Sequence, residues 1–181
     1  MTASLPSSTP SEAPIQSGFL NRVWRAMLLE PRLFEEVETD TKAGWQALLV
    51  VIVAGAARGA SFEEGLQGWI GAVAFGLAVW VLAAALLSSL GRIWLRARTN
   101  WGEMLRALGF AAAPLAFLAP LGWLPPPVRP PSEFVVHGWS GLAVVLATRE
   151  AFDVSTSRAV VACVLGLGAA FAVLALLGHG A

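Results

Sequence analysis

The sequence predicts an all-α, polytopic membrane protein: a transmembrane helical bundle of about five spans, preceded by a short interfacial amphipathic helix. Hydrophobic residues make up 56% of the 181 residues and charged residues only 13%, whereas a typical soluble chain is roughly 25% charged. The mean hydropathy is +0.67. The charges gather in short clusters between long charge-free stretches, which is the pattern expected when lipid is the solvent.

Composition divides the chain into three regions. Residues 1–16 are rich in Ser and Pro, with neither the basic nor the apolar part of a signal peptide, which predicts a disordered tail. Residues 17–42 are predicted to be a cytoplasmic or interfacial helical segment, and residues 43–181 the transmembrane domain. The net charge is zero, so no nucleic-acid partner is expected.

A helix predicted within residues 17–29 has one apolar and one basic face. Arg22 and Arg25 lie on the basic face. The apolar face consists of Phe19, Leu20, Val23, Trp24 and Met27. Two interpretations remain open: the helix lies in the membrane interface with its arginines toward lipid head groups, or it packs on the rest of the protein.

Pro31 ends this helix and suits the first position of a second short helix. Acidic residues surround it, and we expect them to form ordinary solvated surface. They are Glu30, Glu35, Glu36, Glu38 and Asp40.

Long apolar stretches predict the membrane spans. The predicted spans are residues 43–59, 68–95, 103–124, 133–148 and 157–177. The second is the clearest, because residues 68–90 carry no charge and a span needs about 20 residues. The first and fourth are short, which leaves open whether they cross fully. Gly55 and Gly59 in the first span have the spacing that lets two helices approach closely.

The third span contains Pro114, which removes a backbone donor and predicts a kink. A stretch with five prolines follows at residues 125–131. We expect it to be a stiff, non-helical loop outside the membrane.

The basic residues predict the orientation, because cytoplasmic loops carry an excess of Lys and Arg. With five spans and the N-terminus inside, only Arg58 and Arg129 lie outside. The inner side holds Arg22, Arg25, Arg32, Lys42, Arg92, Arg96, Arg98, Arg106, Arg149 and Arg158. This asymmetry predicts a multi-pass protein of the inner (cytoplasmic) membrane, with a cytoplasmic N-terminus and an external C-terminus.

The sequence contains none of the short motifs that mark zinc proteases, redox dithiols, phosphate loops or serine hydrolases. We therefore predict no catalytic, cofactor-binding or metal-binding residues, and no cofactor. His137 and His179 are expected to be interfacial histidines near span ends. Cys163 and Trp80 are expected to be packing residues inside spans.

Arg149, Glu150, Asp153 and Arg158 lie close together in the sequence on the predicted inner side. We expect an interfacial ion-pair network that holds the helix ends. A catalytic or ion-coupling group is the alternative, in an enzyme acting on lipid head groups. His137 falls on the opposite side in the predicted topology, which argues against a site shared with the cluster.

Three segments together resemble the Yip1-domain family of small multi-span membrane proteins. They are Leu29–Phe34, Asn100–Pro114, and Trp139–Glu150 followed by Ser155–Ala159. Phe110 stands where many relatives have Tyr, and the Pro-rich loop is a second departure. The resemblance implies five helices with a cytoplasmic N-terminus, and structural or interaction roles for the motif residues. These are Pro31, Phe34, Gly109, Phe110, Pro114, Arg149 and Glu150.

The Arg-rich composition and short tail are typical of a prokaryotic-type member, so the link of eukaryotic relatives to small GTPases is not carried over. We expect a non-catalytic scaffold, assembly or membrane-organising factor. Its expected partners are membrane lipids and other membrane proteins or further copies of itself. The alternative is a small-solute transporter or channel component that uses a Pro-broken third helix.

Overall fold

The computed structural model describes residues 18–60 and 65–179, and within these ranges every regular element is a helix. The tail predicted for residues 1–16 lies outside them. The elements are α1 (Phe19–Met27), α2 (Pro31–Thr39), α3 (Ala43–Gly59), α4 (Gly65–Leu90), α5 (Trp101–Ala111), α6 (Leu118–Leu121), α7 (Arg129–Phe152) and α8 (Thr156–His179). A π-helical turn, Gly91–Leu95, continues α4, and a 3₁₀ turn, Ala113–Phe117, joins α5 to α6. The all-α prediction is confirmed.

Three helical stretches of the described chain are long and apolar enough to cross a membrane: Gly65–Leu95, Trp101–Leu121 and Thr156–Leu177. They correspond to the second, third and fifth predicted spans. The first corresponds to α3, which is apolar but has only 17 residues. The fourth lies within α7, which has 24 residues but is less apolar. The count of five spans therefore stays a prediction.

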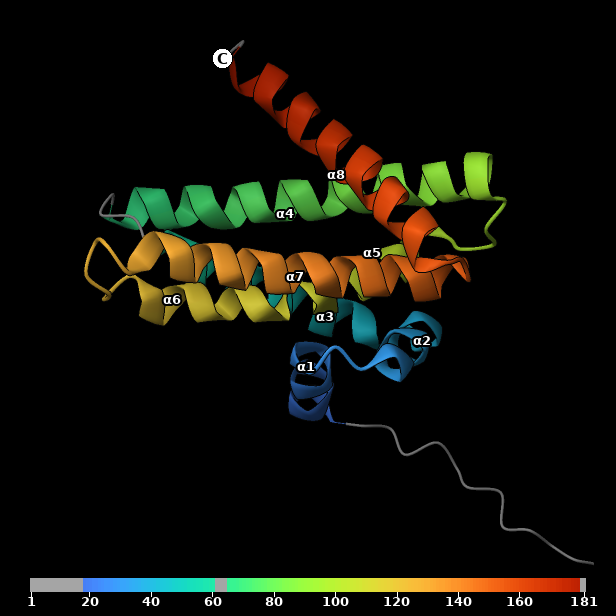
Figure 1. Ribbon diagram of the computed structural model, residues 1–181, viewed down its shortest axis with the longest axis horizontal. Coiled ribbons are helices and arrows are strands. Elements are labelled where there is room, and N and C mark those ends of the chain that lie inside the picture. The colour runs from blue at the N-terminus through green and yellow to red at the C-terminus, as the bar shows by residue number, and fades with distance from the viewer. Residues whose placement is uncertain (1–17, 61–64, 180–181) are drawn as a thin grey trace, which may run out of the picture.

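The long helices run side by side, and the chain reverses direction from each to the next (Figure 1). One end of this bundle, called here the charged end, holds α2, the start of α5, the end of α7 and the start of α8. The other end, called here the α6 end, holds α6 and the start of both α4 and α7 (Figure 1). Arg58 and Arg129 lie at the α6 end.

Helices α3 and α4 touch backbone to backbone through two glycines. A Cβ added at Gly55 would stand 2.8 Å from the Val73 Cα, and one at Gly59 would stand 2.9 Å from the Trp69 Cα. Any side chain at either position would push the helices apart. The close approach predicted from this glycine spacing is confirmed.

The third predicted span is broken at Pro114, as expected for a residue with no backbone N–H. Helix α5 ends at Ala111, and Pro114 lies in the 3₁₀ turn that follows. The Leu115 N–H bonds to Ala112 instead of continuing the α-helical ladder. The carbonyl of Ala111 accepts a hydrogen bond from the Ser140 hydroxyl of α7, 3.1 Å away. A backbone carbonyl freed by the break therefore has a hydrogen-bond donor on a neighbouring helix.

The expectation that residues 125–131 are wholly non-helical is wrong at their end. Helix α7 begins at Arg129, so Pro130 and Pro131 occupy its first turn. The N–H groups of a first turn have no intrahelical partner, so proline loses nothing there. The prolines therefore start α7 and make it longer than the predicted fourth span.

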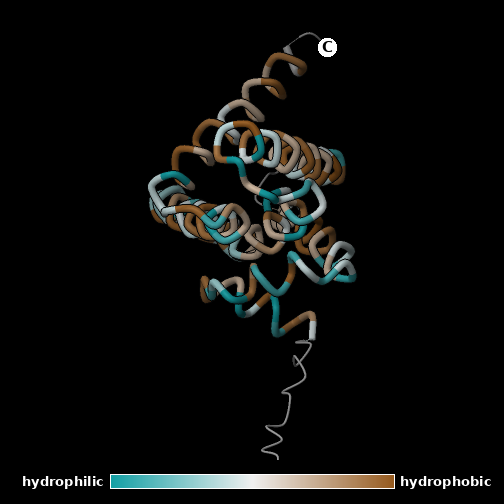
Figure 2. The backbone as a smooth tube through the Cα atoms, turned by 90° about the vertical axis from the view of Figure 1, so that its right-hand side faces the viewer, coloured by the Kyte–Doolittle hydropathy of each residue, from teal (hydrophilic) through white to brown (hydrophobic). Residues whose placement is uncertain are grey.

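Helix α8 packs between α4 and α7 near the charged end and then diverges, so that its C-terminal half projects away from the bundle (Figure 1). Near its middle, Gly166 lies against the Leu87 side chain of α4. Viewed along the bundle, the C-terminal part of α8 projects beyond the other helices, and its colouring is mainly apolar (Figure 2). Most side chains of its second half are exposed.

Candidate functional site

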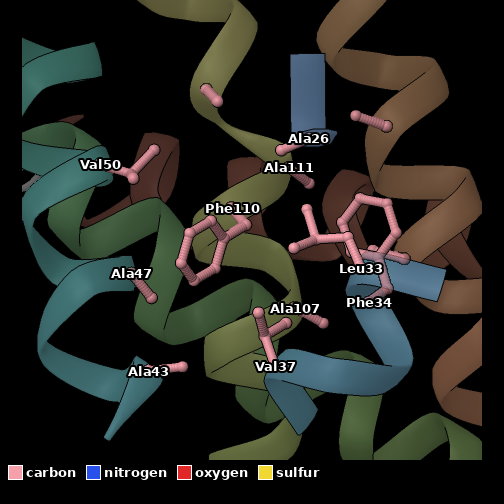
Figure 3. Close-up of a cluster of buried hydrophobic side chains, with 13 residues drawn as sticks. Ala26, Leu33, Phe34, Val37, Ala43, Ala47, Val50, Ala107, Phe110 and Ala111 are labelled. Carbon is pink, nitrogen blue, oxygen red and sulfur yellow. The ribbon is translucent and has the colours of Figure 1, made fainter. Parts of the chain in front are cut away.

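Two of the family-motif residues meet in one apolar core at the charged end (Figure 3). Phe34 of α2 and Phe110 of α5 are both fully buried. Leu33 of α2 and Ala47 of α3 belong to the same cluster. The sequence pattern identified Phe34 and Phe110 separately, and the structure shows that they fasten α2 onto the bundle.

The remaining motif residues of this region shape the backbone around that core. A Cβ at Gly109 would lie 2.5 Å from the Ala47 Cβ, so only glycine fits between α5 and α3. Pro31 occupies the first position of α2, as predicted. Pro114 is buried beyond the end of α5.

The arginines of α1 point into the protein, which contradicts the interpretation that they face lipid head groups. Arg22 is 3% exposed and pairs with Glu36 at 3.0 Å and Asp40 at 2.7 Å. Arg25 pairs with Glu30 at 2.8 Å and with Glu36 at 2.5 Å. The hydrogen bond from Arg25 lowers the pKa of Glu30. Charged groups removed from water need such partners, so α1 packs on α2 through them.

The outer face of α1 is apolar. Leu20, Trp24 and Leu28 are respectively 78%, 59% and 61% exposed, and they follow one another at helical spacing. Trp139 of α7 donates a hydrogen bond from Nε1 to the Met27 carbonyl at 2.9 Å, which fixes the end of α1 to the bundle. The helix thus packs on the protein by one side and offers an apolar stripe suited to a membrane interface by the other.

The sequence suggested that the acidic residues beside Pro31 form solvated surface. This expectation is wrong for Glu38. One oxygen of Glu38, Oε1, is buried without a hydrogen-bond partner in the described structure. Burial raises the pKa of Glu38 to about 7, assisted by the charges of Glu103 and Glu150. Arg106 donates to the backbone carbonyls of Val37, at 2.8 Å, and Glu38. Its guanidinium therefore binds the end of α2, and its charge only partly offsets the effect of burial on the pKa of Glu38. No sequence signal marked this arrangement.

The predicted four-residue network at the end of α7 is only a pair. Arg149 and Glu150 form an ion pair with each other. Asp153, with φ 50°, ends α7 and is exposed, as is Arg158. Neither makes an ion pair within the described residues. The four side chains therefore do not form a common site.

Cys163 and Trp80 pack inside the bundle, as expected. Cys163 is buried, with Sγ 3.3 Å from the Thr148 hydroxyl. The Trp80 indole packs inside the bundle and donates to the Leu105 carbonyl at 2.9 Å. His137 lies near the start of α7, about 18 Å along that helix from Arg149. The side chain of His179 lies outside the described part of the chain.

A cavity of about 410 Å³ lies inside the bundle, lined by residues of α3, α4, α5, α7 and α8. Its wall is almost entirely apolar. Arg58 and His137 line it toward the α6 end, and Arg58 Nη1 lies 3.1 Å from His137 Nε2. Ala112 and Leu115, which flank the break in the third span, also line it, whereas Pro114 does not. Such a space suits an apolar molecule with one polar end.

The described residues contain no group of three or more His, Cys, Asp or Glu side chains placed to hold a metal ion. The distinctive features of the described chain are the docked α1–α2 pair, the cavity, and the diverging helix α8.

The family model of the Yip1 domain matches residues 25–178. The match begins at Arg25 near the end of α1 and ends within α8, so it covers α2, the cavity and the bundle but only the last turn of α1. No curated protein and no solved structure shows significant similarity to the chain. The extent of the family match and the apolar helices together establish a membrane protein that belongs to the Yip1 domain family.

Proposed function

We propose that this Yip1-family protein is a non-catalytic scaffold that organises other membrane proteins, or copies of itself, in the inner (cytoplasmic) membrane. One observation carries the proposal. The second half of α8 leaves its own bundle and exposes apolar side chains along its length (Figure 1). The exposed side of this membrane helix offers a surface for helices of another chain.

The exposed face of α8 has the composition of a helix-pairing surface. Gly168 and Ala172 are exposed and four residues apart, and a Cβ built at Gly168 meets nothing within 4 Å. Small residues at this spacing let a second helix approach closely in lipid, where packing drives association. Val164 and Leu176, 66% and 76% exposed, flank them.

The polar groups inside the bundle favour a structural role. The Ser140 hydroxyl and the Trp80 indole each donate to a backbone carbonyl, and so does the indole of Trp139. These groups are occupied in holding helices together. Members of the Yip1 family are generally non-enzymatic membrane proteins, which agrees with this role.

The charge distribution supports a cytoplasmic N-terminus and an external C-terminus. Ten of the twelve basic residues lie on α1 or α2 or at the charged end, and basic residues favour the cytoplasmic side. In this orientation the exposed stripe of α1 lies against the inner leaflet, where membrane lipids are its partners.

The transporter alternative receives less support. A solute pathway through the broken third helix would require polar groups along the cavity and access to Pro114. The cavity wall is apolar, and Pro114 is buried outside it.

Extraction of the tagged full chain from its native membrane in a mild detergent tests the scaffold role. The proposal predicts a stoichiometric membrane-protein partner or a defined homo-oligomer. Gly168→Ile should reduce this association by at least about tenfold, since a bulky side chain separates the helices. Gly141→Ile is the matched control, because Gly141 is also exposed and unobstructed, on α7. A monomer recovered alone, or equal association in both variants, would contradict the proposal.

A further inference from the structure

We propose that the cavity is a phospholipid site that takes one acyl chain between the helices and binds an anionic head group at Arg58. Helices α4 and α7 are joined mainly through α5 on one side and α8 on the other. The cavity lies in the space that they enclose. Because α8 diverges beyond its middle (Figure 1), it covers this space at Leu167 and Phe171 and leaves the part toward the α6 end uncovered.

The size of the cavity matches one acyl chain of one leaflet. Its volume of about 410 Å³ falls within the roughly 300–1,000 Å³ of ligand pockets. Ala72 and Ala83 both line it on α4. About 11 residues of helix separate them, which is about 16 Å. Half of a hydrocarbon core of about 30 Å is about 15 Å.

The apolar wall argues for hydrocarbon as the occupant. Cavities lined by apolar side chains stay dry, because water there finds no hydrogen-bond partners. The lining is aliphatic and aromatic along its inner part, including Val79, Leu108 and Val144. An acyl chain supplies contacts to this wall that water does not.

The polar end of the cavity selects the charge of the head group. The His137 ring donates from Nδ1 to the Glu133 carbonyl at 2.7 Å, because a carbonyl only accepts. Nε2 is then the acceptor for Arg58 Nη1, since a guanidinium only donates. His137 therefore holds the Arg58 guanidinium at the cavity end.

A guanidinium at this position complements a phosphate. Arg58 lies in the last turn of α3, where a long basic side chain reaches the interface while its stem stays in hydrocarbon. Arginine binds phosphate oxygens through several parallel N–H donors. An anionic phospholipid in the leaflet at the α6 end thus complements both the apolar wall and the Arg58 guanidinium.

Native mass spectrometry of the purified full chain tests this site, with phosphatidylglycerol and phosphatidylcholine of identical acyl chains as probes. We expect one tightly bound phosphatidylglycerol per chain and weaker binding of phosphatidylcholine. Arg58→Gln should weaken phosphatidylglycerol binding about tenfold, the loss of a charge-assisted contact, and remove the preference. Arg129→Gln is the matched control, because Arg129 lies at the same end and outside the cavity lining.

A second pair of variants tests the acyl chain. Val79→Phe fills the cavity, whereas Val81→Phe adds the same bulk to the exposed side of α4. Only the first should abolish the bound lipid, and circular dichroism verifies that both fold. Inorganic phosphate should give no adduct at the lipid concentrations used, because the acyl chain supplies most of the affinity.

Three results would overturn the proposal. The first is equal lipid binding in the Val79→Phe and Val81→Phe chains. The second is an unchanged preference for phosphatidylglycerol in the Arg58→Gln chain. The third is a dimer that Val79→Phe dissociates without loss of lipid, which would assign the cavity to a second copy. The purified chain contains no partner protein, so these failures would leave the scaffold proposal standing.

Discussion

Gly109 of α5 lies so close to Ala47 of α3 that a Cβ at position 109 would stand 2.5 Å from the Ala47 Cβ and 3.0 Å from its Cα. This contact lies beside Phe110, in the core that fastens α2 onto the bundle. The glycine therefore sets the distance between α3 and α5, and α2 packs on the second of these helices.

Gly109→Ala should destabilise the protein by about 1–3 kcal/mol, because the added methyl group overpacks a contact between two helix backbones. Thermal unfolding in detergent measures this effect. Gly138→Ala on α7 is the control, since a Cβ there meets nothing within 4 Å, and alanine in a helix is favoured over glycine. A stable Gly109→Ala chain with an unchanged melting temperature would contradict the close packing.

Arg22→Gln should loosen α1 from α2. The buried guanidinium bridges Glu36 and Asp40, and its loss removes the arginine partner of Asp40 and one of the two arginine partners of Glu36, at a cost of about 1–3 kcal/mol. Limited proteolysis should then cleave between α1 and α2 faster than in the original chain. Arg32→Gln, at an exposed position of α2, should leave the cleavage rate unchanged. Equal rates in both variants would mean that Arg22 does not hold α1.

The raised pKa of Glu38 predicts a stability that depends on pH. Burial disfavours its carboxylate, so the pKa is about 7 in the folded chain, against an ordinary value of 4.5. Between these values the folded state binds more protons than the unfolded state, and stability falls as the pH rises toward 7. Above pH 7 this contribution levels off.

Melting temperatures measured from pH 4.5 to 8 test this dependence. Glu38→Gln keeps the neutral form at every pH and should flatten the decline. Glu35→Gln should not, because Glu35 is exposed on the same helix. A decline of equal slope in the Glu38→Gln chain would assign it to other carboxyl groups.

The proposed orientation predicts which loops are accessible from outside the cell. In a Cys163→Ala background, Pro126→Cys should react with a membrane-impermeant maleimide in intact cells. Ser155→Cys, in the turn between α7 and α8, should react only after lysis. Labelling of position 155 in intact cells would reverse the orientation, and labelling of both positions would contradict passage of α7 through the membrane.

Much of the bundle could be predicted from sequence, because lipid imposes simple rules on chain composition. Apolar length located the second, third and fifth spans, Pro114 marked the break, and Gly55 with Gly59 marked a close helix contact. These are properties of local sequence. The structure confirms the break and the close contact, and its described residues contain three helical stretches long and apolar enough to cross a membrane where these spans were predicted.

Relationships between distant residues could not be predicted in the same way. Arg22 and Arg25 look like head-group ligands from helical spacing alone, because their partners Glu36 and Asp40 belong to another helix. Glu38 resembled its exposed neighbours, because only the docking of α2 on α5 buries it. The cavity lies among helices far apart in the sequence, and nothing in the local pattern of α8 indicates where that helix leaves the bundle.

Photo-crosslinking in intact native membranes tests the scaffold role most directly. A photoreactive residue replaces Ala172 on the exposed face of α8, and in a matched chain it replaces Gly141 on α7. The scaffold role predicts one or a few discrete protein adducts from position 172 and far fewer from position 141. Lipid adducts alone from position 172, with no protein adduct above the level at position 141, would contradict it.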